Sequence, residues 1–206
     1  MFNKFRSIYD SEALRERLSH IRHVALDMDG TIYMGQSLFP YTRPFLQRLR
    51  EMGITYSFLT NNPSTSIADY LHKLAGMGIE ATKEEMYTTA LATIDYIRTR
   101  YPDARRLFIL GTPSMTEEFV RAGFEPTANS AEDRPDAVVV AFDKTLEYDR
   151  LCRAAYWVQQ GLPYVATNPD RVCPTDQPTV LVDCGSICKC IEHATGCQPD
   201  IVLGKP

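Results

Sequence analysis

Short apolar runs alternate with longer amphipathic segments along most of the chain. The run VAL at residues 24–26 is apolar without alternation, which is typical of a strand covered on both faces of a sheet. In the segments between such runs, apolar residues recur at helical spacing, and we expect Ser64 to cap one of these helices. The expected strands are 24–26, 54–62, 85–89, 105–111, 136–142, 163–167 and 200–206, and the expected helices are 11–20, 40–53, 65–78, 90–101, 114–123, 148–161 and 186–196. This alternation predicts a parallel sheet with helices on both faces.

The pattern of strands and helices starts again near residue 104, after a first βαβαβα series. We therefore expect two α/β units, with a boundary between residues 88 and 104. A polar segment that contains proline, residues 125–135, is predicted to be a loop inside the second unit.

Composition and charge argue against several classes of function. Hydrophobic residues make up 44% and charged residues 23% of the 206, an ordinary balance for a globular protein. The formal net charge is −4 and no Lys/Arg cluster is interleaved with aromatic residues, so we expect no nucleic-acid partner. No apolar run reaches about 18 residues, so we expect no membrane span. Residues 1–18 have no apolar signal core, which makes the cytoplasm the expected location.

Four of the six cysteines lie between residues 184 and 197. Their spacing contains no C-x-x-C pair and does not match a zinc knuckle. We expect free thiols in a reducing compartment.

Two aspartates, Asp27 and Asp29, directly follow the first apolar run. Burying two carboxylates this close together is costly unless a cation lies between them. Polar residues also follow the second expected strand, at 60–62, and Lys205 follows the last. Ligands of parallel sheets bind at the carboxyl ends of the strands, so these side chains are expected to converge. Magnesium suits such oxygen ligands and leaves positions for phosphate oxygens.

This set of side chains is suited to phosphoryl transfer. Asp27 can attack phosphorus and form an aspartyl phosphate, while Asp29 can protonate the leaving oxygen and then deprotonate water. Gly30 permits a tight turn and the Thr31 hydroxyl can fix it. Taken singly, the aspartates also fit a solvated turn, residues 60–62 a helix-entry loop and Lys205 a surface lysine.

The motifs DMDGTIY, FLTNNPS, ATNPD and VLGKP, taken in this order, resemble the haloacid dehalogenase superfamily and its NagD-like branch, to which the p-nitrophenyl phosphatases and pyridoxal phosphatases belong. The resemblance spans residues 21–206. It implies an α/β fold with a Rossmann-like parallel sheet core and an inserted α/β cap domain. By resemblance, residues 1–103 and 191–206 form the core and residues 104–190 form a C2-type cap.

The resemblance also implies a role for each motif residue. Asp27 is the nucleophile, Asp29 the general acid and base, and Lys205 the residue that neutralises Asp27 and the phosphate. Thr60 and Asn61 bind the transferring phosphoryl group, with Asn62 beside them in the same motif. Asp27 and the backbone carbonyl of Asp29 hold Mg²⁺.

Aspartate at position 29 favours phosphate ester hydrolysis within this superfamily, because dehalogenases lack it and phosphonatases replace it. The implied substrate is a small phosphorylated metabolite, of the sugar phosphate, nucleotide or pyridoxal phosphate type. A non-catalytic binding or assembly protein and a phosphotransferase or phosphomutase are the alternatives. A homodimer is compatible with this branch, and Asn168 and Asp170 could face the substrate or form a turn.

The superfamily has a fourth signature after the lysine, a G-D-x-x-x-[TS]-D-like segment that supplies further magnesium carboxylates. Pro206 directly follows Lys205, so we expect the chain to be a fragment of a longer enzyme. We also expect residues 24–26 to lie at an exposed sheet edge and the chain to hydrolyse phosphate esters weakly or not at all.

Overall fold

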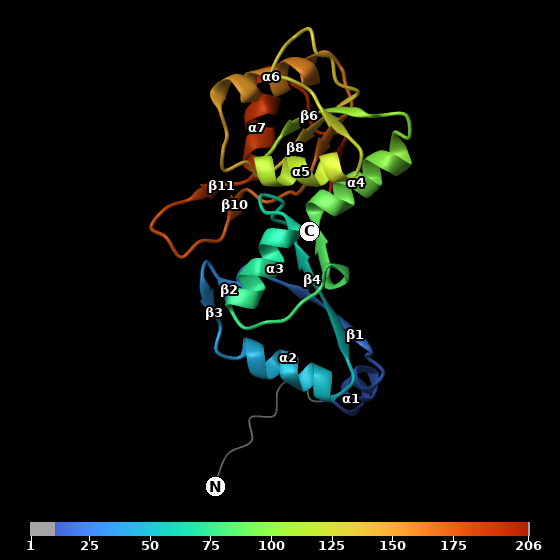
Figure 1. The fold of residues 1–206 in the computed structure, drawn as a ribbon, viewed down its shortest axis with the longest axis vertical. Helices are drawn as coiled ribbons and strands as arrows, with labels where there is room; N and C mark the ends of the chain where they lie inside the picture. Colours follow the sequence, from blue (N-terminus) through green and yellow to red (C-terminus); the bar gives the residue numbers. More distant parts are fainter. Residues whose placement is uncertain (1–10, 206) are drawn as a thin grey trace.

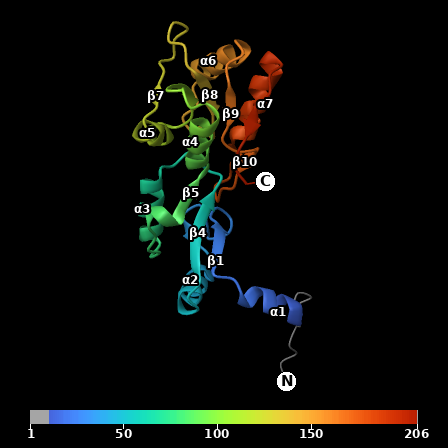
Figure 2. The ribbon, with the colours of Figure 1, turned by 90° about the vertical axis from the view of Figure 1, so that its right-hand side faces the viewer.

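The computed structural model describes residues 11–205. Its two larger sheets, each with its helices, lie one above the other (Figures 1 and 2). The first sheet and helices α1 to α3 lie toward the N-terminus, and the second sheet and helices α4 to α7 lie at the other end of the molecule (Figure 1). The helices are α1 (Glu12–Ser19), α2 (Thr42–Glu51), α3 (Ile67–Gly76), the 3-10 helix η1 (Lys83–Glu85), α4 (Thr89–Arg100), α5 (Pro113–Arg121), α6 (Tyr148–Gln159) and α7 (Cys184–Thr195). The C-terminal end of the described chain returns to the junction between the two parts (Figure 1).

The first sheet is parallel and has the order β1 (His23–Asp27), β4 (Thr55–Thr60), β5 (Met86–Thr88). The register pairs Asp27 with Leu59 and Thr60 with Thr88, so the carboxyl ends of all three strands meet at one edge. β1 is an outer strand of this sheet. Phe58 on the central strand is completely buried, and buried residues alternate with more exposed ones along β4. The run 24–26 in β1 was expected to be covered on both faces, but only Leu26 is buried there, because β1 is an outer strand.

Helix α3 starts two residues later than the sequence suggests. Ser66, and not Ser64, is the N-cap residue, and it forms a capping box with Asp69. The hydroxyl of Ser64 instead donates to Asn62 Oδ1 at 2.6 Å. The expectation for Ser64 was therefore wrong, because Asn62 competes for its hydroxyl in the loop that leaves β4.

The second sheet is also parallel, in the order β12 (Ile201–Val202), β9 (Tyr164–Ala166), β8 (Ala137–Val140), β6 (Arg106–Leu110), β7 (Glu125–Pro126). α6 and α7 cover one face, with Trp157 and Ile187 in the core, and α4 and α5 cover the other, with Ile97 and Phe119. All four residues of β8 are buried, as expected from an apolar run without alternation. The predicted α/β fold is confirmed.

Strand β12 joins the second sheet, although the predicted domain division assigns residues 191–206 to the core with the first sheet. Strand β7 forms at the start of the segment 125–135, which was predicted to be a loop. The exact domain boundaries therefore remain a proposal. None of the described helices is both long and apolar enough to span a membrane.

Two small hairpins, absent from the sequence prediction, lie between the two parts. One consists of β2 (Tyr33–Met34) and β3 (Ser37–Leu38), and the other of β10 (Val172–Cys173) and β11 (Leu181–Val182). The backbone N–H of Gln36, in the turn of the first hairpin, donates to Oδ2 of Asp176, in the loop of the second hairpin, at 3.5 Å. The two hairpins therefore contact each other beside the junction of the two larger sheets, where they lie on the same side of the molecule in Figure 1.

Candidate active site

The loop that follows β1 is fixed by short backbone hydrogen bonds. The N–H of Ile32 donates to Met28 O at 2.8 Å, and the N–H of Gly30 donates to Tyr33 O at 2.8 Å. Gly30 has a φ of +84°, a conformation that favours glycine. The hydroxyl of Thr31 donates to Asp27 Oδ2 at 2.8 Å, so the same loop also orients this carboxylate.

Lys205 lies at the end of β1 although 178 residues separate it from Asp27. Its ammonium group forms an ion pair with Asp27 Oδ1 and donates to Leu59 O at 3.2 Å. Its backbone N–H donates to Asn61 Oδ1 at 2.7 Å. Strand β4 and the residue after it therefore position Lys205 at two points. The carbonyl of Leu59 accepts from its ammonium group, and the side chain of Asn61 accepts from its backbone N–H.

The residues after β4 mainly position their neighbours. Thr60 is 4% exposed, and its Oγ1 accepts the N–H of Asn62 at 3.1 Å. The side-chain amide of Asn61 donates to Asp170 Oδ2 at 2.8 Å and to Lys205 O at 3.1 Å. Asn61 therefore connects the core, the cap and the lysine segment in one place.

All six sequence-predicted site residues border one cavity of about 420 Å³. They share it with further residues that come mainly from the second hairpin and the start of α7, namely Asp170, Val172, Cys173, Pro174 and Asp183. Of these, sequence reasoning named only Asp170. No local sequence motif marks Cys173 or Asp183 as a site residue. Both border the cavity only because the second part of the molecule packs against the first.

The two aspartates of the loop differ in their surroundings. Burial is the main cause of a raised pKa at Asp29; the nearby Lys73 opposes this shift and the charge of Asp27 adds to it. Asp29 Oδ2 is buried and has no hydrogen-bond partner among the described residues. Asp183 lies at 2% exposure, and burial raises its pKa to about 6.

The oxygens of this loop fit a magnesium ion. Asp27 supplies a carboxylate oxygen, the kind of ligand that Mg²⁺ prefers, and the backbone carbonyl of Asp29 is a second oxygen donor at the same cavity. Within residues 11–205 there is no group of three or more potential metal-ligating side chains. Water and substrate oxygens would therefore complete the shell, as is usual for Mg²⁺.

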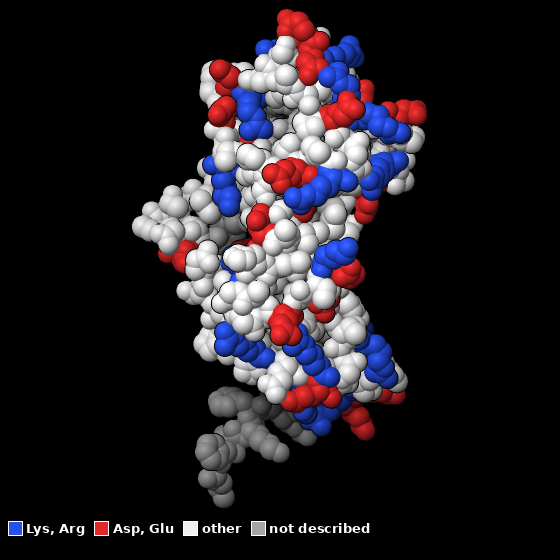
Figure 3. Space-filling model, in the orientation of Figure 1, with Lys and Arg blue, Asp and Glu red and all other residues white. Residues whose placement is uncertain are grey.

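The six cysteines are all free, as expected from the sequence. The Sγ atoms of Cys184 and Cys188 lie 3.8 Å apart inside the cap. Lys and Arg alternate with Asp and Glu over the face seen in Figure 3, and this face shows no broad basic patch.

Comparison with known proteins agrees with this geometry. The family model for haloacid dehalogenase-like hydrolases matches residues 24–125. The ribonucleotide monophosphatase NagD of Escherichia coli K12 is 31% identical over 186 residues, which are 90% of this chain and 70% of that protein. The chain belongs to the haloacid dehalogenase-like hydrolase family. The acid sugar phosphatase of Staphylococcus aureus USA300 is 32% identical over 181 residues, 88% of this chain and 68% of that protein.

Solved structures of this hydrolase family have the same arrangement. A 4-nitrophenylphosphatase from Thermotoga maritima superposes with a TM-score of 0.82 at 37% identity, over 91% of this chain and 69% of that one. A glycerol phosphate phosphatase from Mycobacterium tuberculosis, in complex with magnesium, gives 0.81 at 31% identity, over 90% and 55% of the two chains. These relatives confirm the predicted NagD-like branch and the prediction of a phosphoric monoester hydrolase.

Proposed function

We propose that this chain hydrolyses small phosphate monoesters through an aspartyl phosphate on Asp27. The observation that most strongly supports the proposal is the ion pair between Lys205 and Asp27 at the end of β1, beside Asn61. A lysine held against the nucleophile can offset the negative charge that gathers on the transferring phosphoryl group. Thr60 and Asn61 stand at the neighbouring strand end, where they would contact that group, with Asn62 next to them.

The reaction has two steps in this proposal. An oxygen of Asp27 attacks phosphorus while Asp29 gives its proton to the leaving oxygen, so that the alcohol departs and the acyl phosphate remains. Asp29 then takes a proton from water, which attacks phosphorus, releases inorganic phosphate and restores Asp27. The raised pKa of Asp29, caused mainly by burial, supports its role as the acid.

We assign Asp27 and the backbone carbonyl of Asp29 to Mg²⁺. When bound, the ion would neutralise part of the charge on the phosphoryl oxygens. Because so few carboxylates are available to it, we expect weak magnesium binding and slow turnover in this chain.

The cap, proposed to comprise residues 104–190, would close the site and exclude water that does not react. The names of the relatives include a ribonucleotide monophosphatase, an acid sugar phosphatase and a glycerol phosphate phosphatase, and these names support a small phosphate monoester as the substrate. We expect the protein in the cytoplasm, and a homodimer is compatible with the proposal.

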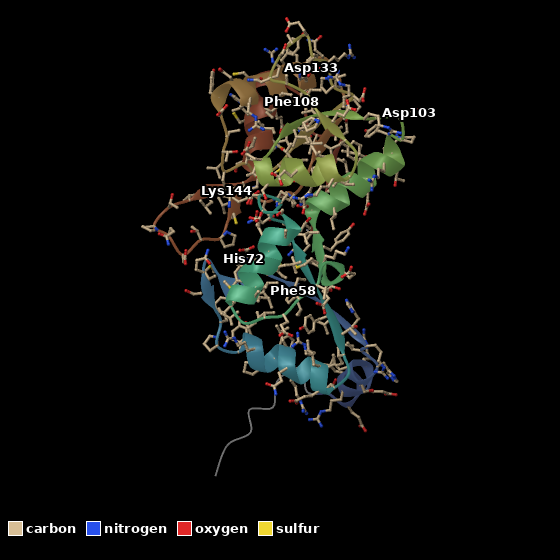
Figure 4. The ribbon with its side chains drawn as sticks, in the orientation of Figure 1. Phe58, His72, Asp103, Phe108, Asp133 and Lys144 are labelled. Carbon is tan, nitrogen blue, oxygen red and sulfur yellow. The ribbon has the colours of Figure 1, made fainter. Side chains whose placement is uncertain are left out.

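A phosphate-release panel tests the proposal. With Mg²⁺ and esters of the three types, we expect release from the wild type and a loss of about 10³-fold or more in Asp27→Asn, because the nucleophile is removed. Asp103→Asn is the matched control, since Asp103 is exposed and lies at the far end of α4 (Figure 4).

The same panel distinguishes the alternatives. Absence of release from the wild type, with substrate bound, would indicate a binding protein. Transfer of phosphate to an added acceptor alcohol, in place of water, would indicate a phosphotransferase.

A further inference from the structure

A second and larger cavity, of about 800 Å³, adjoins the catalytic one. The two share the side chains of Asp29, Asn62, Cys173 and Pro174. The larger cavity lies between α3 and the hairpin β10–β11, near the place where the surface in Figure 3 is hollowed. An ester whose phosphoryl group lies at Asp27 would extend its leaving group into this space.

Two lysines from different parts of the molecule border this cavity. Lys73 comes from α3, and its ammonium group lies 3.7 Å from the centroid of the Tyr33 ring. Lys144 comes from the loop after β8, and in Figure 4 it lies at the edge of the cap that faces His72 and helix α3. In the described part of the chain, neither ammonium forms an ion pair with a carboxylate.

Hydrogen bonds of the buried Asp143 fix the loop that carries Lys144. Asp143 is buried, and its Oδ1 accepts the N–H and the hydroxyl of Thr145 at 2.8 and 2.6 Å. Arg150 donates to its Oδ2 at 3.1 Å. The cap therefore presents Lys144 on a fixed backbone while its side chain remains exposed.

Two of the three acidic side chains that border this cavity have hydrogen-bond partners, whereas Asp29 Oδ2 has none among the described residues. Asp69 accepts hydrogen bonds from the hydroxyls of Ser66 and Ser114 at 2.6 and 2.7 Å. Asp176 accepts the N–H of Gln36. Burial lowers the pKa of Lys73, Asp29 opposes this, and the charge of Lys144 lowers the pKa further. An anion between the two lysines would relieve their repulsion.

We propose that Lys73 and Lys144 bind a second anionic group on the leaving part of the substrate. The preferred substrates are then phosphate monoesters that also carry a carboxylate or another phosphate. This inference rests on the proposed phosphatase function, and it makes Lys73 and Lys144 determinants of specificity. A purely structural role of Lys73, as a cover for Tyr33, would affect acidic and neutral esters equally.

Matched substrate pairs test this inference. They are 3-phosphoglycerate against glycerol 3-phosphate, 6-phosphogluconate against glucose 6-phosphate, and fructose 1,6-bisphosphate against fructose 6-phosphate. Two partly exposed ion pairs should raise kcat/KM for the acidic member about tenfold. The first two pairs report on a carboxylate and the third on a phosphate, so the preferred anion is identified as well.

Neutralising either lysine should abolish the preference. In Lys73→Gln and in Lys144→Gln, the ratio of kcat/KM within a pair should fall several-fold, mainly through KM. The control is Lys189→Gln, which removes the same charge from the cap at a side chain that is 73% exposed and outside the cavity. An unchanged ratio in both cavity variants, with hydrolysis intact, would refute the inference and leave the proposed function standing.

A binding measurement decides the matter if turnover is too slow to measure. Calorimetry with Mg²⁺ compares 3-phosphonopropionate with propylphosphonate, which differ in the terminal carboxylate and resist hydrolysis. Tighter binding of the carboxylate, lost in Lys144→Gln and retained in Lys189→Gln, would support the inference. Equal affinities, or no binding of 3-phosphonopropionate at millimolar concentration, would overturn it. Absence of phosphate release from every ester would count against the proposed function alone.

Discussion

Asp27 and Asp29 are two residues apart but have different surroundings. The oxygens of Asp27 have a hydroxyl partner, Thr31, and a cationic partner, Lys205. Asp29 is more deeply buried and retains an oxygen without a partner. A cation beside Asp27 suits a group that must receive the phosphoryl charge, and burial raises the pKa of Asp29, which suits an acid, so the surroundings separate the two proposed roles.

Asp183 gives a testable dependence of stability on pH. Its pKa is about 6 in the folded protein, because of burial, against 3.8 for the free side chain. Between these values the folded state binds more protons than the unfolded state, so the free energy of unfolding falls as the pH rises. We expect a loss of about 2 kcal/mol from this group between about pH 4 and pH 7. In Asp183→Asn, the free energy of unfolding should not show this decrease with pH. Urea unfolding in the absence of metal measures it.

Asn at position 183 retains an oxygen for the N–H of Cys184, which Asp183 now accepts at the start of α7. The helix cap should therefore survive the substitution. Asp103→Asn, at an exposed position, should leave the pH dependence unchanged. The same pH dependence in Asp183→Asn as in the wild type would contradict the assignment.

Residues beside a local motif were predictable, and residues brought by the cap were not. Asp27 and Asn61 stand at the ends of neighbouring strands of one parallel sheet, which brings them together, whereas Lys205 follows β12 of the second sheet and reaches Asp27 through the packing of the two parts. Lys73 lies on a helix of ordinary pattern, and Asp183 is an ordinary helix cap. The nearness of Asp183 to Asp29 depends on how the two units pack, and that of Lys73 on how α3 packs against the segment after β1. Periodicity encodes neither.

At the scale of elements, Arg150 ties helix α6 to the strands beneath it. It forms an ion pair with the buried Asp143 at 3.1 Å, and it donates to the carbonyls of Ile109 and Gly111 at 2.8 and 3.1 Å. Arg150→Met would leave Asp143 buried without its cation. We expect a loss of about 3 kcal/mol in the free energy of unfolding of the cap, measured by denaturant titration.

Arg121→Met is the matched control. Arg121 pairs with Glu117 on the surface of α5, and both side chains are more than half exposed. Its loss should cost about 0.5 kcal/mol or less. A similar decrease in the free energy of unfolding in the two variants would show that the buried pair of Arg150 and Asp143 stabilises the protein no more than the exposed pair does.

The long elements followed from the sequence, whereas five of the two-residue strands did not. Helices α2 to α7 lie inside or within two residues of the expected segments, because each has several turns of periodic apolar residues. Strands β2, β3, β7, β10 and β11 have two residues each. Such pairs contain too few positions for an alternating pattern, and neighbours from distant segments decide whether they pair.

At the scale of the whole molecule, core and cap meet through polar contacts at helix ends. The N–H of Ile67, at the start of α3, donates to Glu118 Oε1 of α5 at 2.7 Å. The hydroxyl of Thr112 donates to Ser64 O at 2.9 Å. Both hydrogen bonds use backbone groups that a helix end or loop would otherwise leave to water.

The contact between the two hairpins can be tested at Gly35. A Cβ on Gly35 would overlap the carboxylate of Asp176, and its φ is +57°. Gly35→Ala should therefore push away the loop between β10 and β11. We expect trypsin to cleave after the exposed Arg171 about threefold faster or more.

Gly53→Ala separates this contact from backbone strain. Gly53 has a φ of +67°, close to that of Gly35, but a Cβ added there would meet no atom within 4 Å. Gly53→Ala should therefore introduce similar backbone strain, but trypsin should cleave after Arg171 at the wild-type rate. Equal cleavage in the two variants would mean that the hairpins do not support each other.

The ion pair of Lys205 and Asp27 joins positions 178 residues apart, and Asn61 reaches Lys205 across 144. Contacts that close such long loops cost much chain entropy and tend to form late in folding. Local helices can form while Asp27 still lacks its cationic partner. Under the proposed function, a newly synthesised chain is therefore expected to be inactive until the segment with Lys205 has joined the site.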